Sequence, residues 1–407
     1  MKYDKLFPIV RAGLSYSILF LWCATAWGYD LTLIPSLKLR GEYDDNVTFS
    51  RKVEEDDFIG TASPALTFGY RSELVRFDST LGADFKGYMD ESDLNTTTRR
   101  CNMNGSYQIT ERYSLSGNFS YTKDTTLESE LEETGLVVGR EDRKRLTGGG
   151  GITYRLDEVS NLGMEFYRSS TRYEGQDYVD YRSNTAIIYY NHTLNDQRDI
   201  ITVQSMYSNT RSDVSKIRNY GLSFGLAHAF TERLRFDGYV GIRYTKSDYR
   251  MMRSWISIDP ATGFLVYYFS SQKEKDNDVG GTANISLTGQ GEISSWLVGY
   301  SRDLTYSSYG ESIETQRLYG KASRKLTPRM EMGIAGSFYM TESQGNIRDE
   351  ESRYYEITPS LEYRITEDHS LRLAYNYSRD YDKRLVSDRT AERNRIWVTL
   401  IFRFKGF

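Results

Sequence analysis

Apolar and polar side chains alternate along one short segment after another, from about residue 30 to the end of the chain. In the segment LRLAYNY at Leu371–Tyr377, every second residue is leucine or tyrosine, and arginine, alanine and asparagine lie between them. Because successive side chains of a β-strand point to opposite faces, each such segment predicts a strand with one apolar and one polar face. We count about 18 of these segments and find no helical stripe among them.

The composition agrees with an all-β fold. The 407 residues include 34 Tyr and 33 Gly but only 6 Pro, and 14% of the residues are aromatic. Aromatic residues favour strands, and the chain has too many of them to be disordered. No Pro/Gly/Ser-rich linker or long run of one charge divides the sequence, so one domain over residues 29–407 is expected.

The first 28 residues have the pattern of an export signal peptide. Lys2, Lys5 and Arg11 come before the apolar run GLSYSILFLWCATAW, and small residues suited to cleavage follow at Ala26 and Gly28. The run is shorter than the ~20 apolar residues that a membrane-spanning helix needs. We therefore expect residues 1–28 to be removed on export.

Cleavage at this point removes three basic residues and one acidic residue, which changes the formal net charge from −4 to −6. Cys101 is then the only cysteine, so no internal disulfide is expected. A net-acidic chain is not a nucleic-acid binder by charge.

The connections between the predicted strands alternate in length. Those after even-numbered strands are short, and four of them share one pattern: ITERYSL, FTERLRF, LTPRMEM and ITEDHSL. Those after odd-numbered strands are usually longer, as at Asp44–Asp57, Asp124–Arg143, Ser247–Asn277 and Arg379–Asn394. Short turns on one side and long loops on the other are typical of a bacterial outer-membrane barrel, whose short turns lie in the periplasm.

We therefore predict an all-β fold: a transmembrane antiparallel up-and-down β-barrel of about 18 strands, with both termini on the periplasmic side. A soluble β-sandwich has the same alternation of side chains. The signal peptide, the loop pattern and the aromatic residues beside the short turns favour the membrane. These aromatic residues fit an interfacial girdle in contact with outer-membrane lipid, and they are Tyr70, Tyr107, Tyr154, Phe230 and Tyr363.

The last predicted strand, RIWVTLIFRFKGF, has Val398, Leu400, Phe402 and Phe404 on one face and ends at Phe407. A terminal strand that ends in Phe resembles the signal by which bacterial outer-membrane proteins engage the barrel-assembly machinery. We expect that machinery to be a partner and the bacterial outer membrane to be the location.

The polar faces of the predicted strands carry charges of both signs. An isolated charge facing lipid costs ~2–4 kcal/mol at the bilayer midplane, so these residues should face the lumen. About 18 strands enclose a lumen wide enough for water, which favours a mixed-charge channel over a cross-braced structural interior. The residues expected in the lumen are Lys38, Arg40, Glu42, Arg76, Asp78, Asp84, Lys86, Arg235, Asp237, Arg243, Lys321, Arg372 and Arg403.

The longest loop contains two β-prone runs on either side of DPATG, which predicts a hairpin that extends the eleventh and twelfth strands. The hairpin is unusually apolar for a surface loop. It could fold into the mouth as a constriction, contact sugar rings, or pack as an ordinary hairpin above the barrel. The residues in question are Trp255, Phe264, Tyr267, Tyr268 and Phe269.

No motif of an enzyme or a cofactor site is present. The three histidines, His192, His228 and His369, fall near the short turns, and none has a nucleophile partner that the sequence identifies. HExxH, Walker and Rossmann patterns are absent. The acidic stretch over Glu42–Asp57 could hold a calcium ion, although it lacks the spacing of a dedicated calcium loop. We expect no catalytic residues, no metal and no cofactor.

The chain resembles a family of outer-membrane proteins called putative β-barrel porin 2. The resemblance rests on E-Y-D-D-N-V at Glu42–Val47, D-D-F-I at Asp56–Ile59 and S-P-A-L at Ser63–Leu66. It implies an outer-membrane conduit for secreted exopolysaccharide, with periplasmic export machinery as a partner. The residues by themselves show only a barrel.

Three functions are thus open at this point. The first is a translocation pore for an exopolysaccharide, whose Tyr-rich and polar walls suit sugar hydroxyls. The second is a general diffusion porin for small solutes. The third is a non-conducting structural or adhesion barrel, or a barrel enzyme with a histidine site at the outer rim.

Overall fold

A computed structural model of the chain describes residues 29–404, except residues 176, 195–197, 259–264, 344–350 and 384–389, and the side chains of residues 251–273. The predicted signal peptide and Phe407 lie outside the described residues, so both stay predictions. No helix in the described part of the chain is both long and apolar enough to cross a membrane.

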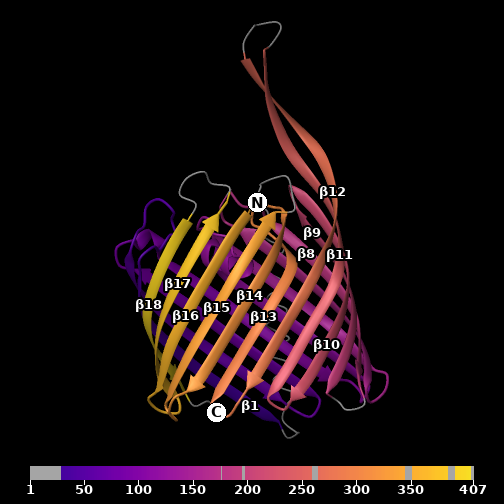
Figure 1. The fold of residues 1–407 in the computed structure, drawn as a ribbon, viewed down its shortest axis with the longest axis vertical. Helices are drawn as coiled ribbons and strands as arrows, with labels where there is room; N and C mark the ends of the chain where they lie inside the picture. Colours follow the sequence, from indigo (N-terminus) through magenta and orange to yellow (C-terminus); the bar gives the residue numbers. More distant parts are fainter. Residues whose placement is uncertain are drawn as a thin grey trace.

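Eighteen antiparallel strands form one closed sheet in which each strand pairs with its sequence neighbours and β1 also pairs with β18 (Figure 1). The predicted barrel and its strand number are confirmed. The strands are β1 (Asp30–Asp44), β2 (Asp57–Arg71), β3 (Val75–Tyr88), β4 (Thr96–Gln108), β5 (Tyr113–Thr125), β6 (Asp142–Arg155), β7 (Ser160–Tyr173), β8 (Tyr181–Thr193), β9 (Asp199–Ser212), β10 (Ser215–Thr231), β11 (Leu234–Ile258), β12 (Leu265–Gln290), β13 (Ser294–Tyr306), β14 (Ser312–Lys325), β15 (Met330–Ser343), β16 (Glu351–Arg364), β17 (His369–Asp382) and β18 (Thr390–Arg403).

The period-two pattern places apolar side chains on the outside of the barrel. Leu39, Phe85 and Val240 are 41%, 52% and 52% exposed, although each lies in the middle part of a strand. A sheet whose large apolar side chains point outward needs lipid around it, so the apolar belt is the membrane-contacting surface. The aromatic residues expected beside the short turns include Tyr107, Phe230 and Tyr363, which are all among the exposed residues.

All turns at one rim are tight, and they follow the even-numbered strands. Three of them repeat one hydrogen-bonding arrangement, in which a threonine hydroxyl accepts from backbone N–H groups two and three residues later, as Thr110, Thr327 and Thr366 do. The repeated phrase in the sequence is therefore a repeated turn. Both described ends of the chain lie at this periplasmic rim.

Among the described residues, two short helices lie outside the sheet: η1 (Ser92–Leu94) and α2 (Thr126–Thr134). The alternating segments did not predict α2, which lies in the long connection Asp124–Arg143. Its nine residues are too few for a repeated apolar stripe, because only Leu127 and Leu131 mark its apolar side.

Candidate functional site

The loop between β5 and β6 crosses the inside of the barrel. Its helix α2 starts where β5 ends, and its far end is bound to β15, which lies nine positions from β6 in the ring of 18 strands. The Tyr339 hydroxyl donates to the Glu132 carbonyl at 2.8 Å, and the Thr341 hydroxyl donates to the Thr134 carbonyl at 2.5 Å. Only a segment that spans the lumen can contact opposite walls, so α2 divides the channel near its extracellular end.

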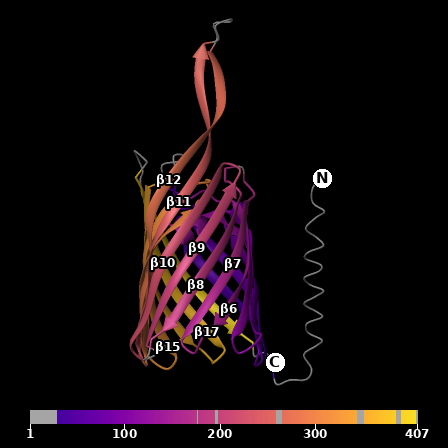
Figure 2. The ribbon, with the colours of Figure 1, turned by 90° about the vertical axis from the view of Figure 1, so that its right-hand side faces the viewer.

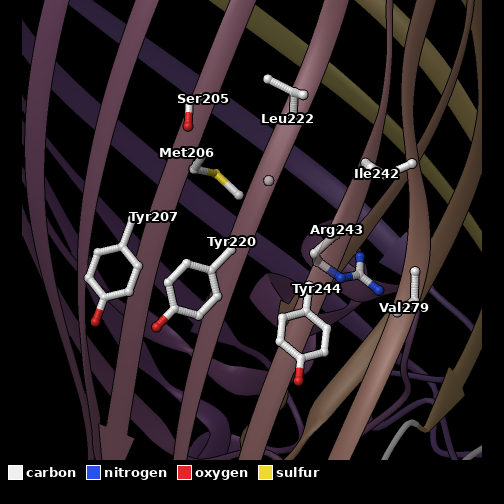
Figure 3. A pocket seen from close by; sticks show the side chains of 10 residues that line it. Ser205, Met206, Tyr207, Tyr220, Leu222, Ile242, Arg243, Tyr244 and Val279 are labelled. Carbon is white, nitrogen blue, oxygen red and sulfur yellow. The ribbon is translucent and has the colours of Figure 1, made fainter.

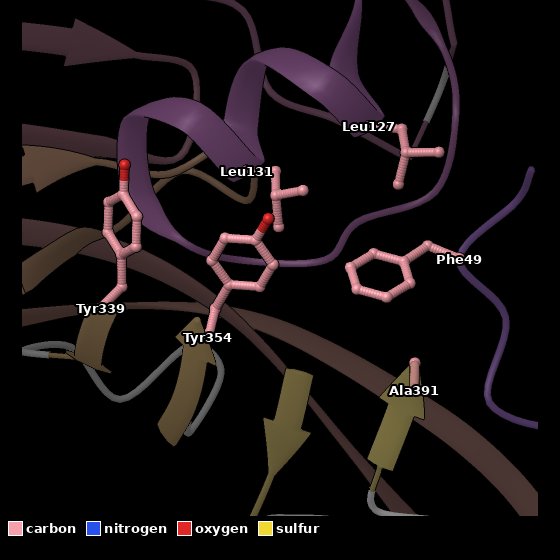
Figure 4. Close-up of a cluster of buried hydrophobic side chains, with 6 residues drawn as sticks. All are labelled: Phe49, Leu127, Leu131, Tyr339, Tyr354 and Ala391. Carbon is pink, nitrogen blue, oxygen red and sulfur yellow. The ribbon is translucent and has the colours of Figure 1, made fainter. Parts of the chain in front are cut away.

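Apolar packing holds α2 against the opposite wall (Figure 4). Leu127 and Leu131 form one buried cluster with Tyr339, Tyr354, Phe49 and Ala391, which come from β15, β16, the β1–β2 loop and β18. Side chains four residues apart lie on the same side of a helix, so both leucines face this wall. Burial of each leucine stabilises the docked position by roughly 2 kcal/mol.

Gly135 ends the helix and permits the close approach to β15. Its φ of 73° is in the left-handed region, and its N–H donates to the Leu131 carbonyl at 3.0 Å. A Cβ at this position would lie 2.5 Å from the Cβ of Tyr339, which is too close for any side chain. The glycine at the end of α2 is thus needed for two reasons: the left-handed turn and the close contact with Tyr339.

Ion pairs hold the polar side of α2 to β3 and β6. The Lys86 ammonium donates to Glu128 at 2.7 Å, and the Arg143 and Arg145 guanidiniums donate to Glu133 at 3.0 and 2.5 Å. Lys86 was predicted to face the lumen, and the contact with α2 places it there. The lumen segment is therefore held by charges on one wall and by apolar contacts on the other.

Glu130 is the one acidic residue of α2 that is almost fully buried, with 1% of its surface exposed. The Tyr173 hydroxyl donates to its Oε1 at 3.1 Å, and its Oε2 has no partner. Burial, with a contribution from the negative charge of Glu133, raises the pKa of Glu130 to about 7, although Arg143 and Arg145 oppose the rise. The docked segment thus contains a group that changes charge near neutral pH.

The charged residues expected in the lumen all lie on the strand face opposite the exposed apolar side chains. Several have partners on that face: Arg40 with Glu42 at 2.5 Å, Asp84 with Arg100 at 2.7 Å, Arg235 with Asp237 at 2.8 Å, and Arg372 with Glu362 at 2.5 Å. The outward side chains on these strands are Leu39, Phe85, Leu318 and Leu400. Each remaining charged residue lies an odd number of positions from the outward side chain of its strand and so points inward: Lys38, Arg76, Asp78, Lys321 and Arg403. The charges of both signs therefore gather on the inner wall.

Arg243 is the most enclosed of these charges, with 1% of its surface exposed. Carboxylate oxygens of Asp278, Asp303 and Glu314 lie 3.7–3.9 Å from its terminal nitrogens, while its Nε donates to the Thr245 hydroxyl at 3.1 Å. These residues come from β11, β12, β13 and β14, so the cluster braces the wall below the long hairpin.

The E-Y-D-D-N-V segment closes the barrel at the β1–β18 seam. Asp44 accepts from the Arg393 Nε at 2.9 and 3.0 Å, and Asp45 accepts from the Asn394 backbone N–H at 2.6 Å. Asn46 donates to the Glu392 carbonyl at 2.9 Å. Across the parts of the chain that are described, no group of three or more His, Cys, Asp or Glu is arranged to hold a metal ion.

The long hairpin extends β11 and β12, as the sequence predicted, with pairs from Arg250–Lys273 up to Ile258–Leu265. In Figures 1 and 2 it rises away from the rim of the barrel. The segment whose contacts reach across the lumen is α2. Phe264 lies outside the described residues, and the side chains of Trp255, Tyr267, Tyr268 and Phe269 are not described. Their contact with sugars stays a prediction.

The histidines lie at the periplasmic ends of their strands. The His192 Nδ1 is 3.0 Å from the Ser160 hydroxyl, and His228 is paired with Asp199. The sequence did not reveal the Ser160 partner, because the two residues are 32 positions apart. Ser160 is only 5% exposed, so a substrate cannot reach its hydroxyl.

The outer surface has a shallow depression of about 270 Å³ between β9 and β12 (Figure 3). It is lined mainly by outward side chains, which are Tyr207, Tyr220, Tyr244, Leu222, Ile242 and Val279. Three neighbouring tyrosines beside aliphatic side chains suit the boundary between acyl chains and headgroups. This depression therefore belongs to the lipid-contacting belt and not to the lumen.

Sequence reasoning missed α2 and the residues that hold it. The signal present in the sequence is T-L-E-S-E-L-E-E-T-G, which combines two leucines four residues apart, acidic residues and a glycine stop. The partners on β15, β16 and β18 could not be found in this way, because they are more than 200 residues away in the chain.

Comparison with solved structures finds outer-membrane barrels of low similarity. The outer membrane protein OpdK from Pseudomonas aeruginosa is 10% identical, with 91% of this chain and 99% of that chain covered and a TM-score of 0.45. A BenF-like porin from Pseudomonas fluorescens Pf-5 is 12% identical, with coverage of 91% and 99% and a TM-score of 0.47. The siderophore receptor PirA from Acinetobacter baumannii is 7% identical, with coverage of 92% and 80% and a TM-score of 0.47.

At this level of similarity, the substrates of these proteins do not indicate a substrate for this chain. No curated protein matches the chain. The family comparison covers the first eight strands and the start of β9, including the three segments on which the resemblance in the sequence rests. This protein is a porin-like β-barrel of the bacterial outer membrane, and its residues 30–203 match the family described as putative beta-barrel porin 2.

Proposed function

We propose that this protein is a gated outer-membrane conduit for a secreted exopolysaccharide, with α2 as the gate. The observation that carries the proposal is the path of the β5–β6 loop across the full width of the lumen. A barrel of 18 strands encloses a wide channel, which would leak small solutes if nothing crossed it. A polymer channel needs that width only while the polymer passes.

The way in which α2 is held supports a gate that can move. Its contacts are two leucines, the two ion-paired glutamates Glu128 and Glu133, a hydrogen bond from Tyr173 to Glu130, and two hydrogen bonds to its backbone carbonyls. None of these contacts belongs to the hydrogen-bonded ladder of the barrel. Undocking of α2 would therefore leave the barrel intact, and its cost is the loss of a local set of contacts.

The substrate class in this proposal comes from the family resemblance and from the inner wall. Sugar hydroxyls accept and donate hydrogen bonds, and a wall that offers carboxylates, guanidiniums and tyrosines can satisfy both roles. The periplasmic export machinery is the partner that would feed the polymer and displace α2.

A general diffusion porin is the second candidate. The charged side chains between α2 and the wall formed by β3 and β6 support it, because a passage lined by charged side chains selects small polar solutes. In this case α2 would stay docked and small solutes would pass beside it. The two candidates differ in the size of solute that passes and in what happens when α2 is removed.

The test replaces residues 128–139 by a short Gly-Ser linker in the full-length protein. We expect low conductance from the intact barrel in a planar bilayer and large, stable currents from the variant. A matched control replaces Glu111 and Arg112, two exposed residues of the periplasmic turn between β4 and β5, by Gly-Ser. Equal and solute-size-limited currents from the intact protein and the variant would favour the diffusion porin.

Substrate class is tested in the producing cell. A strain without the protein should keep its exopolysaccharide in the periplasm, and complementation should restore it at the surface. Normal surface polysaccharide in that strain would overturn the export proposal, whatever the conductance shows.

A further inference from the structure

Four tyrosines of the inner wall share one unusual arrangement, in which each is paired across the ladder with a glycine on the preceding strand. The pairs are Tyr167 with Gly149, Tyr189 with Gly163, Tyr239 with Gly225, and Tyr319 with Gly299. In each pair, a Cβ added to the glycine would meet the tyrosine ring at less than 3.0 Å. The ring therefore occupies the space above the glycine that a side chain would fill.

This arrangement turns the rings along the wall. A ring that covers the backbone of the neighbouring strand has one face toward that strand and leaves the other toward the lumen. The residues next to the four tyrosines confirm their side of the sheet, because Phe166, Ile188, Val240 and Leu318 are each at least half exposed on the outside. The tyrosines alternate with them and face inward.

The four tyrosines lie in one band between the middle of the barrel wall and its periplasmic rim. Each is four to seven residues from the periplasmic end of its strand. At ~3.3 Å per residue and a strand tilt of about 40°, this spread corresponds to about 8 Å in height. The lumen segment α2 lies toward the other end of the barrel, so this band is open to the periplasm even when α2 is docked.

Hydrogen-bonding groups lie beside each ring. The Tyr167 hydroxyl donates to Glu165 at 2.5 Å, and the Tyr189 hydroxyl is 3.0 Å from the Thr153 hydroxyl. The ion pair of Arg235 and Asp237 lies on the same face of β11 as Tyr239. The Arg317 guanidinium lies over the Tyr319 ring, with its carbon 5.1 Å from the ring centre, so this ring carries a cation on its face. An aromatic face beside carboxylates and guanidiniums matches both the C–H face and the hydroxyl rim of a pyranose.

We propose that Tyr167, Tyr189, Tyr239 and Tyr319 form a carbohydrate-binding band, on which the sugar rings of a polymer stack as it enters the lumen from the periplasm. This inference rests on the proposed function and gives it a binding site. Cover of a strand glycine by an aromatic ring also strengthens a sheet, and this bracing role would need no ligand. The experiment must therefore separate stacking from bracing.

The experiment measures binding of cellohexaose, maltohexaose and glucose to the purified full-length protein in detergent by isothermal titration calorimetry. One variant changes the four tyrosines to leucine, which still covers the glycines but removes the aromatic faces. A second variant changes them to phenylalanine, which keeps the faces. A control changes four outward tyrosines, Tyr190, Tyr207, Tyr220 and Tyr244, to leucine. Folding of every variant is verified by comparing the electrophoretic mobility of unheated and heated samples in detergent, because a folded barrel changes its mobility only on heating.

We expect a hexasaccharide to bind the wild type, the phenylalanine variant and the outward control, and glucose to bind much more weakly. The leucine variant should lose about tenfold or more in affinity, since a hexasaccharide that covers two rings loses two stacking contacts. Equal binding by the folded leucine variant would overturn the site, and so would the absence of hexasaccharide binding to the wild type. Neither result would overturn export, which the deletion strain tests separately.

Discussion

At the scale of single residues, Glu130 connects the position of α2 to pH. Burial raises its pKa from the ordinary value of 4.5 to about 7 when α2 is docked. Between these values the docked form binds a proton that the undocked form does not. Docking is therefore strongest below the ordinary pKa and weakens as the pH rises through 7, when a charged carboxylate must stay buried. The difference between 4.5 and about 7 corresponds to about 3 kcal/mol at most.

The neighbouring acids do not reverse this direction. Burial, with the charges of Glu128 and Glu356, also raises the pKa of Glu132. The ion pair with Lys86 lowers the pKa of Glu128, so its contribution to docking is lost only in more acidic solution. Glu130 and Glu132 thus favour docking in the same direction, more strongly at lower pH.

We predict that the open probability of the wild-type channel increases from pH 6 to pH 8. Glu130→Gln stays neutral, so this variant should remain closed at pH 8 and lose most of the pH dependence in single-channel recordings. A control, Glu111→Gln, changes an exposed residue of a periplasmic turn and should leave the dependence unchanged. An unchanged pH profile in Glu130→Gln would show that docking of α2 does not depend on this proton.

At the scale of elements, the β1–β18 seam depends on one buried ion pair. Asp44 is fully buried and Arg393 is 3% exposed, and they bind through two nitrogens of the guanidinium. Removal of one partner of a buried pair costs about 3–5 kcal/mol, because the other charge is left without compensation. We predict that Asp44→Asn lowers the midpoint of urea unfolding in detergent by a measurable step.

The comparison for this seam is Asp237→Asn, which breaks an exposed pair with Arg235 within β11. Exposed ion pairs contribute about 0–1 kcal/mol, so this variant should unfold close to the wild type. A double variant, Asp44→Leu with Arg393→Met, should recover part of the loss. Equal midpoints for Asp44→Asn and the wild type would mean that the ladder alone closes the barrel.

The elements differ in how well the sequence predicts them. The strands are predicted by the alternation of apolar and polar residues, because one face of each strand contacts lipid and the other contacts water. The turns follow from the repeated threonine phrase. The helix α2 could not be predicted with the same certainty, since nine residues with two leucines carry too little periodicity, and its packing partners on β15 and β16 are distant in the chain.

At the scale of the whole molecule, the sequence predicts the inner wall better than it predicts the passage through it. Residues such as Arg40, Lys86 and Arg243 reveal their side of the sheet by alternation alone. Their partners depend on which strands close the ring and on which loop folds inward. The composition of the apolar hairpin, which is unusual for a surface loop, suggested it as a possible constriction. The contacts of α2 show instead that a loop rich in charged residues crosses the lumen.

Deletion of the β11–β12 hairpin tests whether α2 or the hairpin blocks the lumen. Beyond Tyr249, β11 has lost its pairing with β10, and β13 pairs with β12 only from Ala283 onward. The upper part of the hairpin therefore adds nothing to the ladders of the neighbouring strands. We predict that removal of residues 253–270, with Met252 and Ser271 joined through an Asn-Gly turn, leaves the thermal unfolding and the conductance of the barrel unchanged.

The measurement is single-channel recording of the shortened protein beside the intact one and the α2 variant. If α2 alone crosses the lumen, only the α2 variant conducts strongly, and a barrel that lacks both segments behaves like the α2 variant. A large current from the hairpin deletion alone would instead assign the gate to the hairpin, as its composition suggested. In that case the contacts of α2 with β15 and β16 would brace the barrel, and the passage would lie beside them.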